Sequence, residues 1–209
     1  MRLEDKDQQV LASQIVRDII KIADELLSDY NIRSGAVMIT LDELRTRFLT
    51  QIISSQDAQK RTLITAFISF IAEWKYRARL IDLIEHGSRE PFFLHIFRGC
   101  LLFESLLKGN PVRPIPPGRH TLSYVLKETH AELGIPAKLD ISSSDFDAEV
   151  QLLNSATSTT DAIQMTGKIR NTLGHNFAWP STSLNQNRYS LAIKCIAAAC
   201  IHAVSNLYS

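Results

Sequence analysis

The chain has 209 residues, of which 45% are hydrophobic and 22% are charged, and its formal net charge is +1 at pH 7. This is an ordinary composition for a globular protein that buries a core of its own. The near-zero net charge excludes a protein that coats nucleic acid non-specifically, because such proteins are strongly basic.

The three cysteines, Cys100, Cys195 and Cys200, lie among apolar residues and lack the spacing of metal ligands. An odd count without a pairing framework is typical of a reducing compartment. The first nine residues are polar and charged, unlike a signal peptide, and no apolar run approaches the roughly 20 residues of a membrane span. We therefore expect a cytoplasmic protein with no membrane partner, no metal and no other cofactor.

Helical periodicity dominates the first 87 residues. Apolar residues recur every three or four positions over 7–28, which predicts a first helix. Residues 32–39 are compatible with a short extended piece. Thr40 and Glu43 have the spacing of a capping box that opens a second helix. A long pattern over 55–87 predicts a third helix that kinks or breaks.

The remainder of the chain predicts further helices separated by turn residues. A helix with Pro91 in its first turn ends at Gly109, and four prolines make 110–120 a stiff loop. Further helices are expected over 121–133, from the cap at 142–145 through Leu153, from a cap at Thr160 to Gly174, and over about 187–207. The last of these is so apolar that we expect it to be buried in the core or in a subunit interface.

No alternation of apolar and polar residues indicates strands, and no βαβ pattern indicates a nucleotide-binding fold. The sequence therefore predicts an all-α protein. Residues 88–209 are expected to form a four-helix bundle, and residues 1–87 an N-terminal helical extension packed against it.

The segment Arg170-Asn171-Thr172-Leu173-Gly174-His175 combines residues suited to RNA cleavage. RNA supplies its own nucleophile, the 2′-hydroxyl, so cleavage needs only proton transfer and positive charge at the phosphate. Histidine exchanges protons near neutral pH, and arginine holds phosphate oxygens with a permanently charged fork. Asn171 can orient either group by hydrogen bonding, and Gly174 is expected to end the helix and turn the chain.

The spacing from arginine to histidine is weak evidence by itself, because short motifs recur by chance. The same spacing class occurs from Arg79 to His86, from Arg89 to His95 and from Arg113 to His120. Only the segment that begins at Arg170 adds an asparagine, a helix-ending glycine and a place just before the last helix.

An arginine, a polar residue and a histidine ahead of the final helix resemble the HEPN superfamily, and residues 98–108 resemble an early helix of such domains. The resemblance covers roughly residues 90–209. It implies a metal-independent endoribonuclease, a toxin or phage-defence effector, that cleaves single-stranded RNA to a 2′,3′-cyclic phosphate. It also implies a homodimer with a composite site and a possible antitoxin or regulatory protein as partner.

On this basis Arg170, Asn171 and His175 are the expected catalytic residues, with Glu104 and Lys168 as possible supporting residues. One histidine per chain cannot readily serve as both acid and base, and the apolar last helix would suit the expected dimer contact. Basic residues outnumber acids near the motif, which favours a local RNA cleft. HEPN toxins controlled by a nucleotidyltransferase antitoxin carry a tyrosine where this chain has Phe177, so that mode of control is not expected.

Other interpretations of these residues stay open. His175 could cap the preceding helix, Arg170 could pair with Asp161 or an N-terminal acid, and Glu104 could pair with Arg170 or Arg98. Phe177 and Trp179 fit core packing as well as base stacking. The alternative for the whole protein is a non-catalytic HEPN-fold module that binds a nucleotide or a protein, and the first 87 residues could recruit a larger partner.

Overall fold

The structure is a computed structural model, and it describes residues 5–35, 38–53, 58–84, 89–112, 115–116, 118, 120–175 and 184–208. Over these residues it is all-helical and contains no strand, so the all-α prediction is confirmed. The elements in order are α1 (Asp5–Ser34), α2 (Leu41–Ile53), α3 (Ala58–Ile81), α4 (Glu90–Lys108), α5 (Leu122–Leu133), α6 (Phe146–Leu152), the 3₁₀ turn η1 (Leu153–Ser155), α7 (Thr159–His175) and α8 (Gln186–Leu207).

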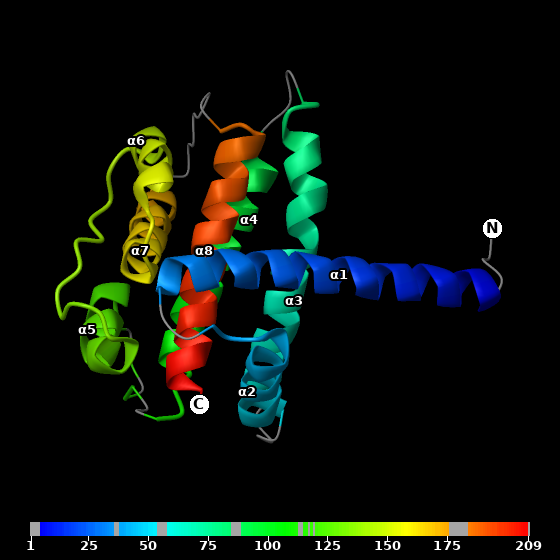
Figure 1. Ribbon diagram of the computed structural model, residues 1–209. Helices are drawn as coiled ribbons and strands as arrows, with labels where there is room; N and C mark the ends of the chain where they lie inside the picture. The colour runs from blue at the N-terminus through cyan, green and yellow to red at the C-terminus, as the bar shows by residue number, and fades with distance from the viewer. Residues whose placement is uncertain are drawn as a thin grey trace.

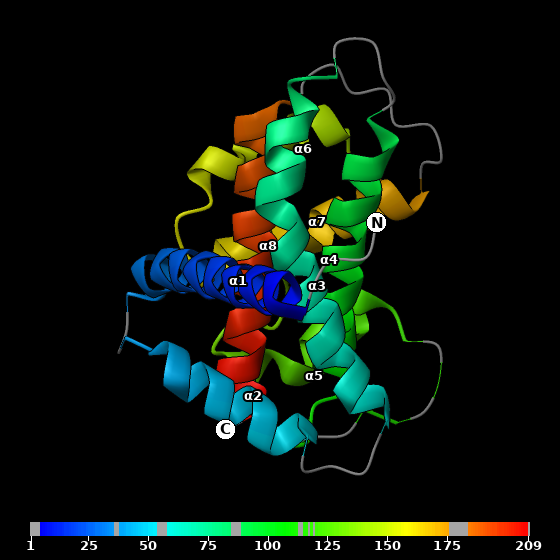
Figure 2. The ribbon, with the colours of Figure 1, turned by 90° about the vertical axis from the view of Figure 1, so that its right-hand side faces the viewer.

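The last helix, α8, lies at the centre of the bundle, and α1, α2, α3, α4, α5 and α7 all contact it (Figure 1). Figure 2 shows the same arrangement from the side, with α3 and α4 running beside α8. Buried residues from the first 87 positions and from the rest of the chain form one hydrophobic cluster. The predicted extension and the predicted bundle therefore share a core.

The central place of α8 explains its composition. Its small residues from Ala197 to Cys200 are all buried, and small side chains let neighbouring helices approach closely. Of the two expectations for this helix, burial in the core is the one observed. The expected use of α8 as a dimer contact is wrong, because other helices of the same chain cover its apolar faces.

Among the residues that the structure describes, α8 is also the one helix long and apolar enough to cross a membrane. That test considers only length and composition, and 72% of the apolar window is buried inside the protein. A core helix satisfies the same test, so its apolarity is explained by packing.

Most predicted helix ends are observed. Glu43 N donates to Thr40 Oγ1 at 3.2 Å, and Thr40 N donates to Glu43 Oε2 at 2.7 Å, which completes the capping box of α2. Gly134 ends α5 with a left-handed φ of 62°, a conformation that favours glycine. The cap of α7 differs from the prediction: Asp161 N bonds Ser158 Oγ at 3.1 Å, so Ser158 replaces Thr160.

Two other local predictions need correction. The extended piece proposed for 32–39 is not seen where the chain is described, because α1 continues to Ser34. The long pattern over 55–87 forms α3, which ends at Ile81 and is followed by a turn.

Candidate functional site

The predicted site lies where α4 and α7 pack against each other. Arg170 Nε on α7 donates a hydrogen bond to Glu104 Oε2 on α4 at 2.9 Å. The Glu104 side chain is 8% exposed and that of Arg170 is 27% exposed, so the pair is largely withdrawn from solvent. A carboxylate in such surroundings needs a cationic partner, and Arg170 supplies one.

The second oxygen of Glu104 is also bonded. Lys108 Nζ, one helical turn further along α4, lies 2.6 Å from Glu104 Oε1. Two cations thus share one buried carboxylate, and the three side chains together keep a net positive charge. That charge lies at the edge of the bundle, because the Lys108 side chain is 40% exposed.

Asn171 continues the chain of hydrogen bonds from Arg170. Arg170 Nη1 donates to Asn171 Oδ1 at 3.0 Å, and Asn171 Nδ2 donates to the carbonyl oxygen of Ile141 at 2.6 Å. The asparagine therefore uses both ends of its amide within the protein. It holds the guanidinium against the segment that precedes α6, which is an orienting role.

The anchor at Ile141 is itself closely packed. A Cβ added at Gly167 of α7 would lie 2.6 Å from Ile141 Cγ2, so only glycine permits this approach of the two segments. Thr172 Oγ1 accepts a hydrogen bond from Ser144 N at 3.1 Å, which fixes the same segment further along.

A cavity of about 630 Å³ opens beside Asn171. Its polar lining comes from Ser123 of α5, from Lys138, Asp140 and Ser142 of the segment before α6, and from Asn171 itself. Hydrogen bonds from the side chain and backbone of Ser142 hold the pKa of Asp140 below its usual value. The cavity therefore offers an ammonium group, a carboxylate and hydroxyl groups within reach of the motif.

His175 is the last residue of α7 and is exposed. It lies four residues beyond Asn171 and so on the same face of the helix, whereas Arg170 points toward α4 and reaches Asn171 sideways. The helix end predicted at Gly174 is observed one residue later, at His175, but the predicted turn at Gly174 is wrong, because Gly174 is helical and has no positive φ; it lies near Phe97 of α4.

Lys168 does not join the cluster around Arg170. Its Nζ lies 3.7 Å from Asp140 Oδ2 and 3.7 Å from Glu149 Oε1. Glu149 is 2% exposed and also accepts a hydrogen bond from Ser144 Oγ. The lysine balances these two acids, of which Asp140 lines the cavity, and it lies three residues before Asn171 on the same face of α7.

The alternative partners proposed for these residues are occupied elsewhere. Arg98 bonds Glu73 at 3.0 Å, and Asp161 accepts hydrogen bonds from the backbone at Thr157 and Ser158. Of the pairings weighed for Glu104, the one with Arg170 is therefore observed. Phe177 and Trp179 lie outside the described residues.

The described residues form neither a metal-ligand cluster nor a site with a reactive cysteine. Within the described parts of the chain no three His, Cys, Asp or Glu side chains could hold a metal ion. Cys100, Cys195 and Cys200 are fully buried, and burial raises the pKa of each thiol, so none is a reactive thiolate. His95 is also buried, and desolvation lowers its pKa to about 4.

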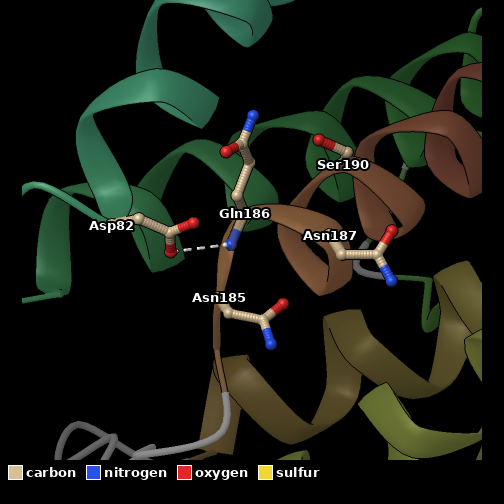
Figure 3. Close-up of a pocket in the computed structure, with 5 residues that line it drawn as sticks. All are labelled: Asp82, Asn185, Gln186, Asn187 and Ser190. Carbon is tan, nitrogen blue, oxygen red and sulfur yellow. Dashed lines mark hydrogen bonds between the residues drawn. The ribbon is translucent and has the colours of Figure 1, made fainter.

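A second cavity, of about 480 Å³, lies at the start of α8 (Figure 3). It is lined by Asp82, Asn185, Gln186, Asn187 and Ser190, and Gln186 N donates to Asp82 Oδ1 at 3.1 Å. Because a carboxylate already satisfies this helix end, the cavity has less to offer an anion than the one beside Asn171.

Comparison with protein-family models, with curated proteins and with solved structures finds no match for this chain. The site therefore has to be interpreted from its own chemistry. Sequence reasoning found Arg170, Asn171, His175 and Glu104, of which the structure joins Arg170, Asn171 and Glu104 by direct hydrogen bonds. It missed Lys108, although the four-residue spacing from Glu104 is visible in the sequence, and it missed the backbone anchor at Ile141, which no side-chain pattern reveals.

Proposed function

We propose that this protein is a metal-independent endoribonuclease of HEPN type that cleaves single-stranded RNA. The observation that carries the proposal is the hydrogen-bonded chain from Glu104 through Arg170 to Asn171, with an exposed histidine one turn further along the same helix. The chemistry needs a guanidinium and an imidazole that can act on the same phosphate group.

The proposed reaction begins with attack of the 2′-oxygen on the adjacent phosphorus. The 2′-hydroxyl proton passes to a base, the bond from phosphorus to the 5′-oxygen breaks, and an acid protonates that 5′-oxygen. The products are a 2′,3′-cyclic phosphate and a 5′-hydroxyl end. His175 is the proton-transfer residue, and Arg170 stabilises the negative charge of the pentavalent phosphate.

Three residues are assigned positioning roles. Glu104 and Asn171 hold the guanidinium of Arg170 from two sides, so its fork is fixed before substrate arrives. Lys168 lies 3.7 Å from Asp140, which lines the cavity beside Asn171, and we assign that cavity to a nucleotide next to the scissile phosphate.

One imidazole serves as acid or base but not readily as both in a single turnover, so we propose that a second copy completes the site. The contact is assigned to the exposed side of α4, where Leu94 is 49% and Leu101 is 39% exposed. Phe97 lies between them and packs against Gly174, next to His175. Pairing of two such faces would bring the two histidines toward one another.

The cellular setting follows from the resemblance and is part of the same proposal. It is a cytoplasmic toxin or phage-defence effector whose activity is held in check by an antitoxin or another regulatory protein. Phe177 lacks the hydroxyl that nucleotidyltransferase antitoxins modify, so control by binding is favoured over control by modification.

One observation favours a second function. Arg170 Nε and Nη1 are both bonded within the protein, which is also what a purely structural arginine does. The alternative is a non-catalytic HEPN-fold module that binds a nucleotide or a protein in the cavity beside Asn171.

The experiment that separates the two uses a labelled RNA oligonucleotide and the same oligonucleotide with 2′-deoxyribose throughout, both in excess EDTA. The nuclease cuts the RNA, leaves 2′,3′-cyclic phosphate ends and spares the deoxy substrate, because the nucleophile has been removed. Binding of both oligonucleotides without cleavage would support the binding module. Cleavage that requires added magnesium would refute the mechanism.

A further inference from the structure

The N-terminal half of α1 extends well beyond the other helices, as Figure 1 shows from the side and Figure 2 shows nearly end-on. Every residue from Asp7 to Asp18 is exposed, and burial begins only at Ile22 and Leu26. About 18 Å of helix therefore contains no buried residue. We call residues 7–20 the arm.

The arm carries an apolar face. Leu11, Ile15 and Val16 are 49%, 50% and 55% exposed, and with Ala12 they occupy neighbouring positions on one side of the helix. Further along α1 the same side is the one that Ile22 and Leu26 bury in the core. A helical segment of this length without tertiary contacts has only marginal stability in water. We therefore expect another surface to cover the apolar face of the arm.

We propose that the arm pairs antiparallel with the arm of a second copy of this chain. Leu11, Ala12, Ile15 and Val16 have the same spacing when read from either end. A two-fold axis midway between Ser13 and Gln14 therefore sets Leu11 opposite Val16 of the partner subunit, and Ala12 opposite Ile15 of the partner subunit. Such a contact is isologous: the same patch is used on both copies, so the pairing stops at a dimer.

Local chemistry favours close approach at this axis. Ala12 is small, so it leaves room for the isoleucine that faces it. Ser13 Oγ bonds the carbonyl oxygen of Gln9 at 2.8 Å, so its hydroxyl is satisfied within its own helix. Arg17 lies on the opposite side of the helix, so pairing does not bury this cation.

Charge sets the direction of the pair. A hollow of about 470 Å³ lies where α1 leaves α3, and its wall carries three cations, Lys21, Lys75 and Arg79, and two acids, Asp18 and Glu25. Glu25, an acid in the same wall, is already bonded to Lys75 at 2.6 Å and Lys194 at 3.2 Å. In the antiparallel register Asp7 of the partner subunit lies level with Ile20, beside this wall, whereas parallel pairing would set Asp7 beside its own copy.

The arm contact is separate from the motif. In Figure 1 the free end of α1 and helix α7 lie on opposite sides of α8. Loss of the arm contact is therefore distinguishable from loss of the nuclease, and arm pairing together with pairing through α4 would build a tetramer from two kinds of dimer contact.

Two matched substitutions test the pairing. Ile15→Asp places a charge in the apolar face, whereas Val10→Asp makes the same chemical change on the opposite face of the arm, where Val10 is 57% exposed. Light scattering on the full chain at micromolar concentration should show that Ile15→Asp halves the mass, and dilution should show an apparent Kd raised about tenfold or more. Val10→Asp should leave both values unchanged.

Disulfide trapping tests the register. The native cysteines are buried, so chains with Ala12→Cys and chains with Ile15→Cys can be mixed and oxidised without interference. The antiparallel pair gives mainly the mixed disulfide. A wild-type monomer at micromolar concentration, equal effects of Ile15→Asp and Val10→Asp, or disulfides only between like chains would each overturn the proposal.

Discussion

Removing the Glu104 carboxylate should cost more stability than removing its arginine partner. Glu104→Ala leaves two cations, Arg170 and Lys108, without the carboxylate they share, whereas Arg170→Ala leaves Glu104 still paired with Lys108. A hydrogen bond to a charged group contributes about 1.5–3 kcal/mol when buried. Because Arg170 is 27% exposed and bonds Glu104 through one nitrogen only, we expect a coupling free energy of about 1–2 kcal/mol.

The measurement is a double-mutant cycle by urea denaturation, followed by circular dichroism, on wild type, Glu104→Ala, Arg170→Ala and the double variant. Glu104→Ala should lower the free energy of unfolding by about 2–3 kcal/mol and Arg170→Ala by about 1–2 kcal/mol. Lys108→Ala is the control and should cost under about 1 kcal/mol, because that lysine is more exposed. Additive single effects, with a coupling near zero, would refute the view that this pair fixes the guanidinium.

Three further predictions concern the bundle. His95 donates from Nε2 to the Phe70 carbonyl and accepts from the Tyr189 hydroxyl. The pKa of His95 is about 4 in the folded protein and 6.5 in the unfolded chain. The stabilisation by neutral His95 is therefore present above pH 6.5 and is lost as the pH falls toward 4. Urea denaturation should show a loss of about 2–3 kcal/mol between pH 7 and pH 4.5, and a His95→Gln variant with the same pH slope as wild type would contradict this. Gly174→Ala should raise the thermal midpoint, equivalent to up to about 0.5–1 kcal/mol, because alanine has a higher helix propensity than glycine and the added Cβ makes only ordinary contacts. A destabilised Gly174→Ala variant would contradict this expectation and indicate a turn at that residue. Gly99→Ala, in contrast, should lower the free energy of unfolding by about 1–3 kcal/mol, since its Cβ would lie 2.4 Å from Phe70 Cε2.

The helices were predictable because their signals are local. The Thr40–Glu43 capping box, the proline in the first turn of α4 and the glycine after α5 each act within one turn of chain, and all are observed. The place of α8 in the bundle was not determined by its own composition, since an apolar helix suits a core and an interface equally. Only the contacts made by the other helices decide between them.

The candidate site likewise has features that are local in the sequence and features that depend on tertiary contacts. The residue types at 170, 171 and 175 were visible in the sequence, but their geometry depends on α4 and on the Ile141 carbonyl, both distant along the chain. Gly174 was misinterpreted because glycine is a common helix terminator. Here the backbone at Gly174 stays helical without a positive φ, and a Cβ at that position would meet Phe97 only at ordinary van der Waals distance, so the glycine is not required for a turn there.

The most direct test of the central claim is the rate of RNA cleavage by His175→Ala in excess EDTA, compared with wild type and with His130→Ala as a histidine control away from the motif. Loss of a proton-transfer group should lower the rate by about 10²–10⁴-fold, while His130→Ala stays at the wild-type rate. Equal cleavage rates in wild type and His175→Ala would contradict the assignment of His175 and, with it, the proposed nuclease site.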